Sequence, residues 1–154
     1  MNSDVTFAKP FISATSSVLS TMAGITPVPG TPFVKKDDIA CGDVSAIIGL
    51  TGEKHGSISV TFTKKCAVAL VRAMLGDDIQ DIIADTKDAV GEICNMISGQ
   101  ARAGLSEMGF KFDGSTPSII MGDAHTVTHV TASPVIAVPF TTDHGEFTIE
   151  FSFG

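Results

Sequence analysis

The stretch GEICNMISGQ, residues 91–100, places a carboxylate and a side-chain amide one helical turn apart, at Glu92 and Asn95. Residues three positions apart in a helix are neighbours, so these two side chains would project together. Gly99 lies one turn further along the same face, although glycine inside a helix costs about 1 kcal/mol relative to alanine. A small residue on an exposed face favours the close approach of another backbone. The stretch therefore predicts a docking surface from which a carboxylate and an amide project.

The helix that holds these residues also has an apolar side. On a wheel of about 100° per residue, one sector of about 80° must face the core, and it contains Val90, Ile93, Cys94, Ile97, Ala101 and Leu105. The polar and small residues cluster on the opposite side, at Asp88, Glu92, Asn95, Gly99 and Arg102. A solvated face would explain any single charged residue. It would not explain the glycines, because alanine, lysine and glutamate are better helix formers.

Other chemistries find little support in the sequence. Residues 49–57, GLTGEKHGS, lack the spacing of a phosphate-binding loop and are typical of a hairpin turn. His125 and His129 fall in one predicted strand, about 13 Å apart, which is too far to ligate one metal ion. No metal site is therefore predicted in this chain. Cys94 lies on the core side of the wheel, which predicts a buried and unreactive thiol.

The elements that must position the helix can be predicted from periodicity and from breaker residues. Helices are expected over 6–24, with Pro10 in the first turn, over 64–75, and over about 84–108. A proline-rich connection over 25–33 leads into a strand. Strands are expected over 43–50, 57–63, 125–132, 135–140 and 146–153, with a short apolar stretch after Pro117. This order predicts the α+β class, with an antiparallel-rich sheet packed against long helices.

The strand pattern carries two further expectations. Ile58, Val60 and Phe62 alternate with small polar residues, so one face of that strand is expected to meet water. His55-Gly56 followed by ISVTF is similar to His144-Gly145 followed by FTIEF at an offset of 89, which predicts a weak pseudo-twofold internal repeat. Chance similarity between two hairpins is the alternative explanation.

Composition narrows the classes of function. The 154 residues suit a single domain over residues 1–154, and the 44% of hydrophobic residues argue against disorder. A net charge of −7 with scattered Lys and Arg argues against a nucleic-acid partner. Three distant cysteines indicate neither a disulfide framework nor structural zinc. The first residues lack a signal-peptide pattern and no apolar run is long enough to span a bilayer, so we expect a cytoplasmic protein without a membrane partner.

Residues 88–105, DAVGEICNMISGQARAGL, closely resemble the signature of the CheX branch of the CheC-like chemotaxis phosphatases. These proteins carry a helical E-x-x-N motif within a sequence of the type D-A-V-G-E-I-x-N-M-I-x-G-x-A-K. Glu92 and Asn95 take the two motif positions. The resemblance extends over VRAMLGDD at 71–78, STPSIIMG at 115–122 and VPFTTDHGEFTIEF at 138–151. Arg102 stands where the family often has lysine, and the positive charge is kept.

The resemblance implies a partner and a reaction. The substrate would be the phosphorylated response regulator CheY, a receiver domain that carries an aspartyl phosphate. The receiver would supply a lysine and the Mg²⁺ ion, so this chain would need no cofactor of its own. Asn95 would orient the attacking water and Glu92 would pair with the receiver's lysine. The docking surface would include Asp88, Gly99 and Arg102.

The resemblance also bears on the number of sites and on assembly. If STMAG at 20–24 aligns with NMISG, then Ser17 and Ser20 stand at the positions of a second site, which leaves one active site per chain. Proteins of this family form homodimers through their sheets, and the strand over 146–153 is a candidate for the joint. The alternatives are a non-catalytic receiver-binding or flagellar-switch-like module, and a structural or sensory domain with a small ligand in its sheet.

Overall fold

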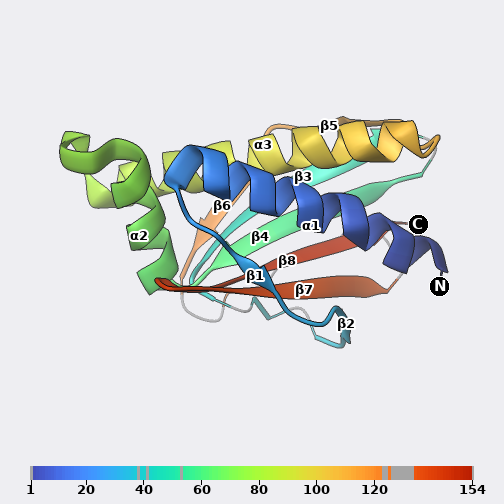
Figure 1. Cartoon of the computed structure of the whole chain (residues 1–154), viewed down its shortest axis with the longest axis horizontal. Coiled ribbons are helices and arrows are strands. Elements are labelled where there is room, and N and C mark those ends of the chain that lie inside the picture. The colour runs from blue at the N-terminus through green and yellow to red at the C-terminus, as the bar shows by residue number, and fades with distance from the viewer. Residues whose placement is uncertain are drawn as a thin grey trace.

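A layer of helices covers one face of an antiparallel sheet (Figure 1). The computed structural model describes residues 2–37, 39–40, 42–52, 54–122, 125 and 134–153. Within these residues the helices are α1 (Asn2–Ala23), α2 (Lys64–Leu75) and α3 (Ile82–Glu107), with a 3₁₀ turn η1 (Gly76–Asp78). The strands are β1 (Val28–Pro29), β2 (Phe33–Lys35), β3 (Val44–Gly52), β4 (Gly56–Phe62), β5 (Phe112–Gly114), β6 (Ser118–Met121), β7 (Val135–Thr142) and β8 (Gly145–Phe153). The predicted α+β class is confirmed.

Two hairpins meet at the centre of the sheet. The strand order is β1-β7-β8-β4-β3-β5, with β2 also paired to β7 and β6 also paired to β3. The hairpins β3–β4 and β7–β8 are joined by antiparallel pairing of β4 with β8, in which Val60 lies opposite Ile149. On either side of this pair, Ile58 lies opposite Phe151 and Phe62 opposite Phe147. The central pair Val60–Ile149 has the same offset of 89 as the sequence similarity, as a twofold axis through this pair requires, although the repeat itself stays a prediction.

Phenylalanine supplies the large side chains of the core between helices and sheet. Phe11 of α1 stacks on Phe151 of β8 with ring centroids 4.8 Å apart, and Phe140 stacks on Phe147 at the same distance. Phe7 makes an edge contact with Phe153. Each of these rings brings a large apolar area out of water, and the contacts of Phe7 and Phe11 with β8 anchor α1 to the sheet.

Helix α1 begins earlier than the sequence predicts. Pro10 lies inside this helix and not in its first turn. A proline in a helix interior removes one backbone hydrogen bond, and this cost has to be offset by packing. The Pro10 ring packs against α3 where Gly104 has no side chain, since a Cβ atom built on Gly104 would lie 3.1 Å from Pro10 Cβ. The glycine therefore allows α1 and α3 to lie side by side over the sheet (Figure 1).

The outer face of the sheet differs from the prediction that one face of β4 meets water. The polar residues of β4 were expected to meet water, but Ser57, Ser59 and Thr61 are all buried. Thr61 shares a hydrogen bond with Ser45 of β3, whose hydroxyl oxygen lies 2.6 Å from His125 Nε2. His125 thus contacts this face and gives the Ser45 hydroxyl a protein partner. His125 is half-buried and belongs to no strand; the rest of the strand predicted over 125–132 lies outside the described residues.

Helix α3, which carries the Glu-x-x-Asn pair, begins two residues before the predicted start at 84. Asp81 caps it, because its side-chain oxygen accepts hydrogen bonds from the backbone N–H groups of Ile83 and Ala84. Asp85 reciprocates by accepting from the N–H of Asp81. Such paired caps satisfy backbone donors that a helix start leaves free and stabilise it by about 1 kcal/mol. The acidic stretch before the helix therefore fixes where α3 starts.

Strand β8 lies inside the sheet. It is hydrogen-bonded to β7 on one side and to β4 on the other, so neither of its edges is free. An edge-to-edge joint along residues 146–153 is therefore excluded, because an edge pairing needs unpaired backbone groups; a joint near this strand through the face of the sheet stays a prediction. Within the described parts of the chain, no helix is both long and apolar enough to cross a bilayer.

Candidate active site

The two sides of α3 are as the wheel predicts. All six residues of the apolar sector are fully buried: Val90, Ile93, Cys94, Ile97, Ala101 and Leu105. On the opposite side Glu92, Asn95 and Asp88 are exposed, whereas Gly99 and Arg102 are half-buried. The anchoring of one side in the core holds the other side in a fixed orientation toward solvent.

Glu92 and Asn95 are not engaged by the rest of the molecule. Within the residues that the structure describes, neither side chain forms a hydrogen bond or an ion pair. An exposed, unpaired carboxylate and amide contribute little to stability, so their identity is not explained by folding. Both groups are available to a partner.

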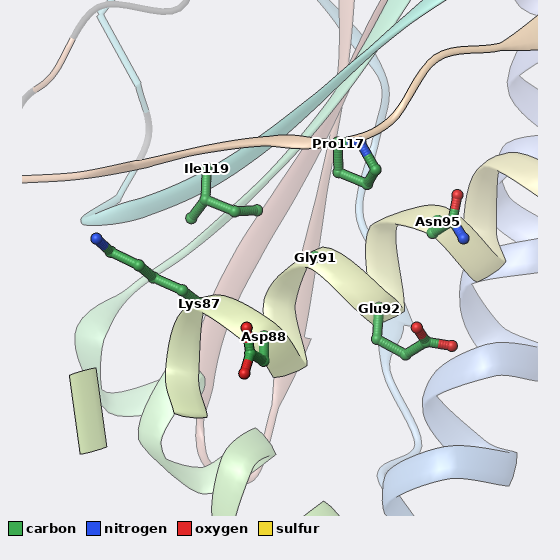
Figure 2. Close-up of a pocket in the computed structure, with 7 residues that line it drawn as sticks. All are labelled: Lys87, Asp88, Gly91, Glu92, Asn95, Pro117 and Ile119. Carbon is green, nitrogen blue, oxygen red and sulfur yellow. The ribbon is translucent and has the colours of Figure 1, made fainter. Parts of the chain in front are cut away.

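The pair borders a groove between α3 and the segment that leads into β6. The groove has a volume of about 250 Å³ and is lined by Lys87, Asp88, Gly91, Glu92, Asn95, Pro117 and Ile119. In Figure 2, Ile119 and Pro117 form one wall, and the carboxylates of Asp88 and Glu92 point away from it. The Asn95 amide extends on the side of Pro117. The predicted residues Asp88, Glu92 and Asn95 thus share one concave surface, which Gly99 and Arg102 do not line.

The three glycines of α3 have different explanations. Gly104 makes room for Pro10, as described above. A Cβ atom on Gly91 would lie 3.3 Å from Ile119 Cδ1, so Gly91 lets β6 approach the helix. A Cβ atom on Gly99 would meet only a terminal guanidinium nitrogen of Arg102 at 4.0 Å. Internal packing therefore explains Gly91 and Gly104 but leaves Gly99 unexplained, which favours an external reason for a small residue there.

Replacing Gly99 with alanine should stabilise the protein. The added methyl group fits without displacement, and alanine favours the helix by about 0.5–1 kcal/mol over glycine. Gly104→Ala is the matched control on the same helix, because its methyl group would press on Pro10 at 3.1 Å and cancel the gain. Urea denaturation of the two variants measures both effects. A Gly99→Ala protein less stable than wild type would show that Gly99 is required by the fold.

Arg102 is held against the sheet. Its Nε donates a hydrogen bond of 3.3 Å to the hydroxyl of Ser98, and its guanidinium group packs on Gly114 of β5. The side chain therefore ties α3 to β5, and its charge lies at the flank of the exposed face.

The cysteines of the core are unsuited to catalysis. Burial raises the pKa of the Cys94 thiol to about 12, and the thiol lies 3.7 Å from the carbonyl oxygen of Ala46. Burial also raises the pKa of Cys66, an effect opposed by a hydrogen bond with Thr142. The predicted burial of Cys94 is confirmed, and a thiol that stays protonated at neutral pH is a poor nucleophile, which supports the predicted inert role.

Sequence reasoning missed three lining residues of the groove. Lys87 was not singled out, although it precedes Asp88 directly, and Pro117 and Ile119 lie more than 20 residues further along the chain. A signal was present in Gly91, since a helix glycine beside the functional face indicates a segment packed closely against it. The sequence alone did not reveal which segment that was.

The chain thus carries an exposed Glu-x-x-Asn pair on the longest described helix, over an antiparallel sheet. The family model described as chemotaxis phosphatase CheX matches residues 44–141. A crystal structure of a chemotaxis protein CheX from Desulfovibrio desulfuricans is 72% identical, with a TM-score of 0.92 over 96% of this chain and 99% of that one. The chain belongs to the CheX family.

Two further relatives have names that bear on function. A CheY-P phosphatase CheX from Thermotoga maritima is 25% identical over 120 residues, which is 77% of either protein. A CheX from Borrelia burgdorferi is 27% identical, with a TM-score of 0.77 over 96% of this chain and 97% of that one, and its crystal structure is a complex with CheY, BeF3 and Mg²⁺. Beryllium trifluoride is a chemical mimic of a phosphoryl group.

Proposed function

We propose that this protein hydrolyses the aspartyl phosphate of a phosphorylated CheY-like response regulator and so ends a chemotaxis-type signal in the cytoplasm. The observation that carries this proposal is the exposed, unengaged pair Glu92 and Asn95 on a rigid helix beside a groove. The names of the two relatives, a CheY-P phosphatase and a partner of CheY, support it. We also propose that residues 1–154 form one such domain, since α1 and the sheet share a single core.

Asn95 has the chemistry needed to position the water. An amide both donates and accepts hydrogen bonds and carries no charge, so it can hold a water near a phosphoryl group without repelling that group. The water oxygen bonds to phosphorus as the bond from phosphorus to the aspartyl oxygen breaks. The electron pair stays on the receiver's carboxylate, and inorganic phosphate leaves with the oxygen and both protons of the water. Phosphoryl transfer of this kind depends mainly on positioning and on charge stabilisation.

Glu92 has the charge needed to fix the approach of the partner. A carboxylate one turn from Asn95 would form a charge-assisted hydrogen bond with the receiver's lysine and so align the water with the phosphorus atom. Asp88 adds a second carboxylate to this face, and Arg102 lies at its flank. Gly99 would leave room for the receiver's backbone, so the stabilised Gly99→Ala variant should bind the receiver less tightly.

The metal ion of the reaction would belong to the partner. Magnesium prefers several oxygen ligands in one place. In the described part of this chain no three His, Cys, Asp or Glu residues gather as a metal site would. We therefore propose that the receiver holds the Mg²⁺ that neutralises the phosphoryl charge, and that this chain contributes only Glu92 and Asn95 to the reacting centre.

The direct test is phosphate release from a CheY-like receiver charged with acetyl phosphate, with and without this protein. The protein should accelerate release catalytically, at a small molar ratio to the receiver. Binding to the receiver without accelerated release would contradict the proposal and would identify a non-catalytic receiver-binding module.

Replacing Glu92 with lysine should weaken docking. The substitution places two positive charges opposite each other, and such contacts cost several kcal/mol, so the Kd for a receiver charged with BeF3 and Mg²⁺ should rise about 100-fold or more. Glu107→Lys is a matched control, because Glu107 is exposed at the far end of the same helix, outside the groove. Titration calorimetry measures both. Equal affinity of Glu92→Lys and wild type would remove Glu92 from the docking surface.

We further propose a homodimer formed through a free edge of the sheet. The edge at β1 and β2 presents Val28, Phe33 and Val34, which are 59%, 44% and 51% exposed. Large apolar side chains at a sheet edge are costly in water and favour pairing with a second copy. Sedimentation equilibrium should give twice the mass of the 16.0 kDa chain. A single species at the mass of one chain would contradict the dimer.

A further inference from the structure

The groove beside Asn95 has two unlike walls. One wall is polar and belongs to α3, and the other is apolar and belongs to the segment at the start of β6. Pro117 and Ile119 of the apolar wall are both half-buried, so each keeps part of its apolar surface in water. The reaction described above requires only the polar wall and gives the apolar wall no role.

The apolar wall is rigid. Ile119 lies opposite Ala46 in the pairing of β6 with β3, and Ser118 lies opposite Ile47. On its other side Ile119 packs over Gly91, where a Cβ atom would be 3.3 Å away. Sheet pairing and helix contact together fix Ile119 beside α3, directly after Pro117 and Ser118 in the chain, and a fixed apolar side chain can discriminate between partners of different shape.

The stripe of α3 nearest this wall consists of Lys87, Gly91 and Asn95, at positions i, i+4 and i+8. Lys87 and Asn95 are thus about 12 Å apart along the helix axis, with the bare backbone of Gly91 between them. Lys87 is exposed and is the one cation among the lining residues of the groove, in a protein whose net charge is −7. A partner that reaches Asn95 through the groove passes the apolar wall and meets a positive charge at the other end.

We infer that Pro117, Ile119 and Lys87 form a second recognition element, which contacts the receiver surface next to the phosphorylated aspartate. An apolar side chain of the receiver packs on Pro117 and Ile119, and a receiver carboxylate pairs with Lys87. The inference rests on the proposed function, since it takes the receiver as the occupant of the groove. In this inference Asn95 positions the attacking water, whereas the apolar wall and Lys87 determine which receivers bind.

The test uses two variants that leave Glu92 and Asn95 in place. Lys87→Glu reverses the charge at the end of the groove, and Pro117→Ser removes the apolar ring before β6 begins. Each should raise KM for a phosphorylated CheY-like receiver about three- to ten-fold with little change in kcat, and Lys87→Glu should weaken the salt dependence of binding. Lys65→Glu is the matched control, because Lys65 is an exposed helical lysine of α2 outside the groove.

The outcomes separate the recognition element from the reaction. If Lys87→Glu or Pro117→Ser behaves like Lys65→Glu in KM and in affinity for the BeF3-charged receiver, that side chain is not part of a recognition element. If wild type binds the charged receiver without releasing phosphate and the two variants bind it more weakly, the recognition element stands and the proposed reaction fails. A fall in kcat at unchanged KM would contradict a docking role and move the residue into the reacting centre.

Discussion

An Asn95→Ala protein should fold normally and lose stimulated dephosphorylation of its receiver. We expect the rate to fall at least about 100-fold, which corresponds to about 3 kcal/mol of transition-state stabilisation. The reason is that alanine offers no group to orient the water, whereas Glu92 and the rest of the docking surface remain. The free energy of unfolding should change little, because Asn95 is exposed and makes no hydrogen bond to the described residues.

Gln100→Ala is the matched control for this substitution. Gln100 is an exposed amide on the same helix and does not line the groove. Loss of label from a receiver carrying radioactive phosphate gives the rate, and binding to the BeF3-charged receiver shows whether docking survives. Phosphatase activity near that of wild type in Asn95→Ala would remove Asn95 from the reaction, whatever the result for docking.

A Lys35→Met protein should lose about 3–5 kcal/mol of stability, the cost of breaking a buried ion pair from one side. Lys35 Nζ lies 2.8 Å from Glu150 Oε2, and the two side chains are only 5% and 1% exposed. Methionine keeps most of the apolar length of lysine but leaves the Glu150 carboxylate buried beside a neutral thioether. Much of the total stability of a domain of this size would be lost.

Two further variants serve as controls for the stability of Lys35→Met. Lys36→Met changes the neighbouring, exposed lysine and should cost less than about 0.5 kcal/mol. The double variant Lys35→Met with Glu150→Gln removes both charges and should recover part of the loss. If urea denaturation finds Lys35→Met as stable as Lys36→Met, the ion pair contributes nothing and Glu150 is satisfied by its other contacts.

The sequence predicts local structure well wherever the residues of a single helix or strand determine its conformation and its buried face. Helix α2 occupies the predicted residues, and the apolar sector of α3 is fully buried, because a stripe of apolar residues at helical spacing has one low-energy arrangement. Alternation in β4 identifies its two faces but not what covers them. Ser59 is fully buried, and periodicity carries no information on what covers a face.

The residues of the candidate site also fall into a predictable group and an unpredictable group. Glu92 and Asn95 are neighbours through the helix itself, so their spacing is sufficient to predict that they project together. Pro117 and Ile119 reach the groove through the pairing of β6 with β3, which the sequence does not specify. The Lys35–Glu150 contact joins residues 115 positions apart, and it too depends on tertiary structure.

The pairing of Val60 with Ile149 at the centre of the sheet bears on the order of folding. These residues are 89 positions apart, whereas the hairpins β3–β4 and β7–β8 close over short turns. Closing a long loop costs more entropy, so the two hairpins are expected to form before β4 and β8 join. Helix α3 and β6 pack on the β3 side and lie close together in the chain. The groove can therefore assemble within one half, while the sheet is completed only when both halves meet.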